Sequence, residues 1–178
     1  REALARSRNP VAVQLAMRVG MDSVIAMARA LGISSFIAPY PSSAIGASVV
    51  QPLDLVAAYA TFANQGMRVE PRFIASIEDR NGTAVWQGRA TAPQPVLDPK
   101  VAFIVRDMMR DAVDRGTASA VRRYVPAGIP VAGKTGTSRK VGGGSYQQAR
   151  YLSLFAGLAP VSAPRLACVI VINDPQGG

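Results

Sequence analysis

Residues 131–138 carry the sequence Val131-Ala132-Gly133-Lys134-Thr135-Gly136-Thr137-Ser138, and this stretch decides the fold. Its β-branched residues favour a strand. Because side chains alternate between the two faces of a strand, Lys134 and Gly136 share one face and Thr135 and Thr137 the other. A glycine at position 136 lets another backbone or a ligand approach closely. The sequence therefore predicts a strand that presents a lysine and two threonines beside an open space.

The preceding residues give this stretch a second interpretation. Residues 128–135 satisfy the pattern G-x-x-x-x-G-K-[ST] of a phosphate-binding loop. Such a loop follows a buried strand, donates successive backbone N–H groups and opens a helix at its lysine. Pro130 has no N–H to donate, and the glycines at 142–144 do not favour a helix. The strand is therefore the favoured interpretation, and a P-loop ATPase is the remote alternative.

Composition limits the classes of function that remain open. The chain has 178 residues, 49% apolar and 17% charged, which fits one domain with a core. Its net charge of +9 comes from scattered basic residues with few aromatic residues between them, so no nucleic-acid partner is expected. With no histidine and one cysteine, neither a metal site nor a cofactor is expected. Cys168 lies in an apolar run, which predicts a small buried core residue.

The first third of the chain is mainly helical in its pattern. A short helical segment precedes a turn at residues 7–10, and Pro10 is expected at the first position of the next helix. Asp22 is expected to cap a helix over 23–31 that Gly32 ends. Residues 33–50 have loop composition, and Pro52 opens a further helix that ends at Gly66.

The remainder has strand character interrupted by one helix. Asn81-Gly82 is a strong hairpin signal between strands at 73–77 and 83–86. Asp98 and Pro99 open a helix that Gly116 ends. Three strands are predicted at 131–138, 151–158 and 166–173, the last two joined by a link short enough for antiparallel pairing. The pattern predicts an α+β fold over 1–178, with a helical part at 1–66 and a hairpin, helix and sheet part at 67–178.

A second motif lies near the beginning of the chain. Ser7-Arg8-Asn9 matches Ser-x-Asn, which with Lys134-Thr135-Gly136 resembles two of the three motifs of serine acyl-transferases in the β-lactamase and penicillin-binding class. By itself, a serine and an asparagine before a helix predict only a cap, supplied here by Asn9. However, collinear agreement with the family extends over most of the chain, through segments 3–9, 51–66, 115–118 and 155–160. The chain thus resembles the C-terminal portion of a penicillin-binding transpeptidase domain.

The resemblance implies a fold, a reaction and roles for residues. It implies an antiparallel sheet flanked by helices, incomplete at its N-terminal side, and peptidoglycan crosslinking by serine acyl transfer on D-Ala-D-Ala stem peptides, with β-lactam antibiotics bound in their place. Lys134 would assist proton relay through Ser7, and Asn9 would bond the acyl side of the substrate. Thr135, Gly136 and Thr137 would bind substrate, the threonine hydroxyls at its terminal carboxylate and the Thr137 backbone N–H in the oxyanion hole.

The family's third motif, Ser-x-x-Lys, carries the nucleophile and occurs nowhere in this sequence. We therefore expect no nucleophile in this chain, no acylation by the chain alone, and an exposed apolar patch. The full-length protein is expected on the extracytoplasmic, periplasmic face of the bacterial inner membrane, anchored by a segment outside this chain. Other cell-wall synthesis or division proteins are further candidate partners.

Several alternatives within the family stay open at this point. A D,D-carboxypeptidase or a β-lactamase-type hydrolase shares the motifs and differs in the acceptor of the acyl group. A non-enzymatic β-lactam sensor shares the binding site without turnover. Segment 44–74 resembles bifunctional enzymes, whereas segment 131–178 resembles monofunctional division-type enzymes, and the sequence leans towards the second class.

Overall fold

The computed structural model describes residues 1–142 and 145–175, with side chains at 1–138 and 151–175. Its elements follow in the order α1 Glu2–Ala5, α2 Asn9–Val19, α3 Met21–Ala30, η1 Pro41–Ile45, α4 Pro52–Ala63, β1 Met67–Arg68, β2 Ser76–Glu78, β3 Ala84–Gln87, β4 Gln94–Pro95, α5 Pro99–Arg115, η2 Ser119–Arg123, β5 Ala132–Gly142, β6 Ser145–Ala159 and β7 Leu166–Asn173. The α+β class expected from the sequence is confirmed.

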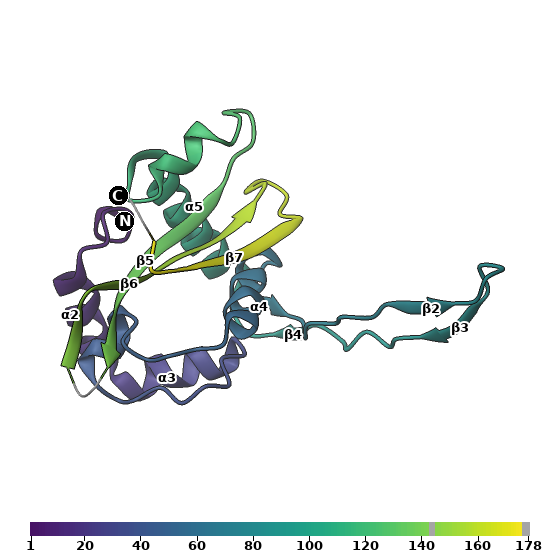
Figure 1. Ribbon diagram of the computed structural model, residues 1–178, viewed down its shortest axis with the longest axis horizontal. Coiled ribbons are helices and arrows are strands. Elements are labelled where there is room, and N and C mark those ends of the chain that lie inside the picture. Colours follow the sequence, from purple (N-terminus) through teal and green to yellow (C-terminus); the bar gives the residue numbers. More distant parts are fainter. Residues whose placement is uncertain (143–144, 176–178) are drawn as a thin grey trace.

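A three-stranded antiparallel sheet forms the centre of the molecule, in the order β5-β6-β7 (Figure 1). Lys134 of β5 lies opposite Ala156, and Thr135 lies opposite Phe155. All three strands predicted from the sequence are present; β5 extends beyond its predicted end to Gly142, and β6 begins before its predicted start, at Ser145. No helix opens at Lys134, so the P-loop interpretation is wrong. The order of strands also leaves β5 with a free edge within this sheet.

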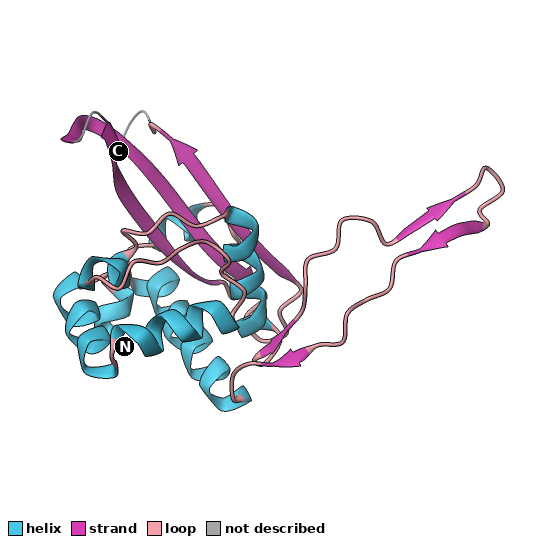
Figure 2. Cartoon of the chain, turned by 90° about the horizontal axis from the view of Figure 1, so that it is seen from below, coloured by secondary structure: helices cyan, strands magenta, loops and turns pink. Residues whose placement is uncertain are grey.

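Helices α4 and α5 supply the apolar side chains that bury one face of this sheet. Figure 2 shows the helices gathered to one side of the three strands. Met109 of α5 packs with Ala132, Leu158 and Val161, and half-buried residues of α1 and α4 complete the cluster. Tyr59 of α4 belongs to this layer, and burial raises its pKa to about 12. The position of β5 is therefore fixed by a core to which α5 contributes.

A smaller core lies where the connection after α5 returns to the sheet. Val113, Ala118 and Val131 are buried there, with Phe155 packed against them. A Cβ at Gly133 would lie 2.6 Å from the Phe155 ring, so the glycine just before Lys134 leaves the space that this ring occupies. This packing holds the first residues of β5 in place.

The predicted hairpin is present and projects from the body as an arm, defined here as residues 69–93 (Figure 1). Ile77 pairs with Trp86 across β2 and β3. The Asp79 carboxylate accepts the backbone N–H groups of Asn81 and Thr83, and Gly82 has φ +79°, as the predicted Asn-Gly turn requires. Strand β2 is shorter than the predicted strand 73–77, because the chain leaves the ladder before Phe73 is reached, and β3 is shifted by one residue from the predicted 83–86.

Three local predictions are wrong. Cys168 is exposed, because it lies on the uncovered face of the edge strand β7 together with Leu166, Ile170 and Ile172. The side chains of Leu166, Ile170 and Ile172 are 70%, 52% and 52% exposed on this face, whereas the apolar patch expected beside an open cleft stays a prediction. Asp22 does not cap α3, whose N-cap is Gly20 and which ends at Ala30. Helix α2 begins at Asn9, so Pro10 is its second residue and Asn9 is not its cap.

The described residues contain no single membrane-spanning helix and no cluster of side chains that could hold a metal ion. No single helix among these residues is long and apolar enough to cross a bilayer. Together, α2 and α3 have the length and composition of a membrane span, but they are bent by 94° at their junction. Among the same residues, no group of three or more His, Cys, Asp or Glu side chains could hold a metal ion.

Candidate active site

Lys134 is a half-buried cation near the start of the edge strand β5. Its Nζ donates to the Thr135 carbonyl oxygen at 3.0 Å and to Thr117 Oγ1 at 3.4 Å. Burial lowers its pKa below the ordinary range of a lysine. An ammonium has three N–H donors. The two bonds that it forms within the described part of the chain leave one N–H for a further partner. A lysine held this way can donate to an anion or a hydroxyl that approaches the strand.

The other residues of the predicted substrate strand differ in their surroundings. The Thr135 hydroxyl donates to Thr117 Oγ1 at 2.8 Å, and Thr137 is exposed. A Cβ at Gly136 would make only ordinary contact with Leu154, at 3.7 Å. Packing within this chain therefore does not require the glycine, and its role in a close approach by substrate stays a prediction.

Ser7 lies in the turn between α1 and α2, Asn9 is the first residue of α2, and both are exposed. Ser7 has φ +53°, a left-handed conformation that is uncommon outside glycine. Among the described residues, neither side chain forms a hydrogen bond, and none joins them to Lys134. The structure thus leaves the Ser7 hydroxyl and the Asn9 amide available, without bringing either into direct contact with the lysine.

Thr117 connects the two motif-bearing segments, and no role was predicted for it from the sequence. Its hydroxyl contacts Lys134 and Thr135, while its backbone N–H donates to the carbonyl oxygen of Ala5 at 3.1 Å. Ala5 ends α1, two residues before Ser7. The only sequence signal was the Gly116-Thr117-Ala118 segment, which resembles the family without indicating a contact.

Ion pairs between α1 and α5 hold the segment that leads to Ser7. Arg1 pairs with Asp107 at 2.6 Å and also with Asp111, and Arg115 pairs with Asp111 at 2.8 Å and also with Glu2. The hydrogen bonds from Arg1 and then Arg115 lower the pKa of Asp111 to about 2. Helix α1 therefore docks on α5 through charged contacts that surround its buried residue, Ala5.

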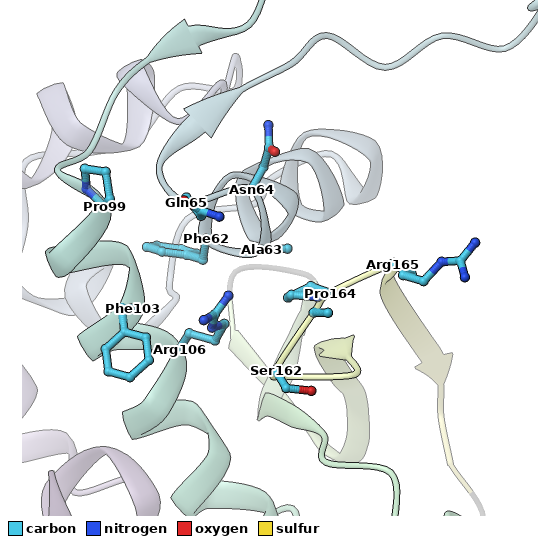
Figure 3. A pocket seen from close by; sticks show the side chains of 11 residues that line it. Phe62, Ala63, Asn64, Gln65, Pro99, Phe103, Arg106, Ser162, Pro164 and Arg165 are labelled. Carbon is cyan, nitrogen blue, oxygen red and sulfur yellow. The ribbon is translucent and has the colours of Figure 1, made fainter.

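A pocket of about 480 Å³ lies elsewhere in the molecule, between the end of α4, the start of α5 and the connection from β6 to β7 (Figure 3). The Arg106 guanidinium lies over the Phe103 ring, 5.6 Å from its centre, and among the described residues its Nε is buried without a hydrogen-bond partner. None of the lining residues belongs to the predicted site. The pocket therefore shares no residue with the predicted site.

Comparison with known proteins identifies a family over the whole chain. The family model described as penicillin binding protein transpeptidase domain matches residues 1–178. Penicillin-binding protein 1A of Aquifex aeolicus is 39% identical over 138 residues, 78% of this chain and 18% of the relative. Penicillin-binding protein 1B of Haemophilus influenzae is 36% identical over 140 residues, with the same two shares. The probable peptidoglycan D,D-transpeptidase PbpC of Pseudomonas aeruginosa is 36% identical over 126 residues, 71% of this chain and 20% of the relative.

Solved structures agree with this result. Penicillin binding protein 3 of Mycobacterium tuberculosis, complexed with aztreonam, has a TM-score of 0.85 at 26% identity and covers 97% of this chain and 44% of its own. The D,D-transpeptidase domain of a peptidoglycan glycosyltransferase from Eggerthella lenta has a TM-score of 0.80 at 26% identity, with shares of 98% and 48%. The chain spans about a fifth of the length of the curated relatives named above and less than half of these solved chains.

Proposed function

This chain belongs to the penicillin-binding protein transpeptidase family, and we propose that the full-length protein crosslinks peptidoglycan by serine acyl transfer on stem peptides that end in D-Ala-D-Ala. The chain would be the C-terminal part of one transpeptidase domain. The names of the relatives do not confirm the leaning towards the division-type class, which stays a prediction.

The observation that carries the proposal is the half-buried ammonium of Lys134 on a strand with a free edge, where it donates to the Thr117 hydroxyl that also accepts from the Thr135 hydroxyl. An extended peptide can pair with the backbone of such an edge. Its terminal carboxylate would then accept from the Thr137 hydroxyl and from the Thr135 hydroxyl, whose hydrogen would turn from Thr117 Oγ1 to the substrate. The remaining Lys134 donor would assist proton relay through Ser7. In this pose the Thr137 backbone N–H would donate to the oxyanion that forms at the reacting carbonyl.

The proposed reaction has two acyl transfers. A serine hydroxyl attacks the penultimate D-Ala carbonyl, its proton passes through Ser7 to the leaving nitrogen, and the peptide C–N bond breaks to release D-Ala. The amine of a second stem peptide then attacks the ester, and the serine recovers a proton. In a β-lactam the broken C–N bond belongs to the ring, so the leaving nitrogen stays attached. Asn9 would bond the acyl side of the substrate in both steps, and the nucleophile would lie outside this chain, since it has no Ser-x-x-Lys.

Partners and location follow from the same proposal. The proposed ligands are peptidoglycan stem peptides and β-lactams, and the complex of the Mycobacterium tuberculosis relative with aztreonam supports the second class. Since the substrate is cell-wall material, the proposed site of action is the extracytoplasmic face of the bacterial inner membrane, with an anchoring segment outside residues 1–178. Cell-wall synthesis or division proteins are further proposed partners.

Acylation by a fluorescent penicillin, followed on a gel, tests the proposal in the full-length protein. We expect the wild type to be labelled and Lys134→Ala to be labelled at least about 100-fold more slowly, as for loss of a group in proton transfer. Lys100→Ala, which changes an exposed lysine at the start of α5, is the matched control and should label normally. Normal labelling of Lys134→Ala would contradict the role of this lysine, and an unlabelled wild type would contradict the function.

Turnover separates transpeptidation from its alternatives. With a D-Ala-D-Ala pentapeptide and an amine acceptor, a transpeptidase forms the crosslinked product as D-Ala is released. A D,D-carboxypeptidase releases D-Ala without that product, and a sensor is labelled by penicillin but releases nothing.

A further inference from the structure

The turn Gly116-Thr117 lies at a junction of three elements whose relative positions matter for the proposed reaction. Thr117 donates its backbone N–H to Ala5 at the end of α1, and its hydroxyl contacts Lys134 and Thr135 on β5. The next residue, Ala118, donates to Ala112 of α5 at 2.9 Å and is itself buried. One short turn is thus bonded to the segment that leads to Ser7, to the strand of Lys134 and to the helix between them.

The close approach at this junction depends on glycine. A Cβ at Gly116 would overlap the Ala5 carbonyl oxygen and lie 2.8 Å from Ala112 Cα. Its φ of −119° is open to any residue, so the reason for glycine is space and not backbone conformation. The contact brings the Thr117 N–H into range of Ala5, and the turn then directs the Thr117 side chain towards β5.

The Thr117 hydroxyl has the bonding capacity that this position requires. A hydroxyl has two acceptor lone pairs and one donor hydrogen. Within the described part of the chain it accepts from the Lys134 ammonium and from the Thr135 hydroxyl. Its own hydrogen is left for a further partner. No carboxylate of the described residues pairs with Lys134, so hydroxyl and carbonyl oxygens are what orient its ammonium.

We propose that Thr117 is a positioning residue for the reaction: its hydroxyl holds the Lys134 ammonium and the Thr135 hydroxyl in the arrangement that receives substrate, and its backbone N–H sets their place relative to the Ser7–Asn9 segment. This inference rests on the proposed function. The hydroxyl contacts are exposed to solvent, so they add little to the stability of the fold. A displacement of about 1 Å in a group that positions a substrate can nevertheless cost about 100-fold in rate.

The test compares threonine variants in the full-length protein, by the second-order rate of acylation with fluorescent penicillin and by the melting temperature. Thr117→Val keeps the shape and removes the hydroxyl, and we expect acylation at least about 10-fold slower with an unchanged melting temperature. Thr117→Ser restores a hydroxyl and should stay within about 3-fold of the wild type, a rescue that a purely structural role does not predict. Thr91→Val, at an exposed threonine of the arm, should change neither quantity.

A double-mutant cycle locates the effect. If Thr117 acts through Thr135, Thr117→Val should reduce the rate of acylation by a clearly smaller factor when Thr135→Val is already present.

Thr117→Ala is a second variant without the hydroxyl, for the case that valine does not pack at this position. The slower acylation should appear in whichever of the two variants retains the wild-type melting temperature.

The outcomes separate the inference from the function on which it rests. Wild-type acylation by a folded Thr117→Val or Thr117→Ala overturns the inference and leaves the proposed function intact. Equal loss in Thr117→Ser and Thr117→Val also overturns it, because the hydroxyl would then not be the cause. A wild-type protein that is not acylated overturns the proposed function itself.

Discussion

At the scale of single residues, the two sides of the site depend on how closely backbones approach each other. Gly116 lets α5 end against the carbonyl oxygen of Ala5, and Gly133 lets the Phe155 ring lie on β5 just before Lys134. Neither glycine has the positive φ that would require it on conformational grounds. The space that each leaves is therefore part of how the Ser7 segment and the Lys134 strand are placed.

Gly116→Ala should destabilise the protein through this lost space. The added methyl group forces α1 and α5 apart, and overpacking of this kind costs about 1–3 kcal/mol. Chemical denaturation of the full-length protein measures the loss, and the rate of acylation should fall with it because Thr117 moves too. Gly128→Ala is the control, since a Cβ there has no neighbour within 4 Å and should leave stability nearly unchanged. Equal stability of the two variants would show that α1 does not need this close contact.

At the scale of elements, the docking of α1 on α5 combines one small buried residue with several charges. Ala5 is fully buried, and Glu2 and Arg1 reach Arg115 and Asp111 of α5 on either side of it. Such a short helix is not stable alone, so its position depends on these contacts. The turn with Ser7 and Asn9 follows directly, and its placement is therefore sensitive to the state of Asp111.

The pH dependence of this junction follows from the sign of the shift at Asp111. Its folded-state pKa of about 2 lies below its ordinary value near 4, so the ion pairs stabilise the folded state above pH 4 and lose that effect as the pH falls towards 2. Asp111→Asn should lower stability at pH 7 by roughly 1 kcal/mol, a figure that allows for solvent screening of the exposed arginines. The difference between wild type and variant should shrink between pH 4 and pH 2 in urea melts. A difference that stays constant over that range would contradict the assignment.

Periodicity predicted most of these elements, because alternation and helical repeats reflect burial of a face. The predicted bounds of β7 are those that the structure has, from Leu166 to Asn173. Periodicity did not predict that the face with Cys168 is uncovered, since a strand's sequence records that a face is apolar and not what lies over it. It also missed Thr117, whose partners are 17 and 18 residues away in sequence and meet it only through tertiary packing. Helix starts were misplaced because Gly20 and Arg8, and not Asp22 and Asn9, occupy the cap positions.

At the scale of the whole molecule, the arm is separate from the packed body. Its strands β2 and β3 are exposed on both faces, with Phe73 85% and Val85 65% exposed, and its hydrogen bonds among the described residues are internal. A two-stranded hairpin of this kind has little stability of its own in water. The body, in contrast, is held by the two cores around β5, and β1 pairs with β4 where the arm leaves it.

Removal of the arm should therefore leave the body and the site intact. Because Arg68 lies opposite Gln94, a four-residue turn can replace residues 69–93. We expect the melting temperature of the full-length protein to change by no more than about 2 °C, as for exposed positions, and acylation by fluorescent penicillin to stay within about 2-fold. Leu158→Ala, at a buried core position, is the contrasting variant and should cost about 2–5 kcal/mol. If the shortened protein melted as early as Leu158→Ala, or lost acylation while folded, the arm would have to contribute to the body or to the site.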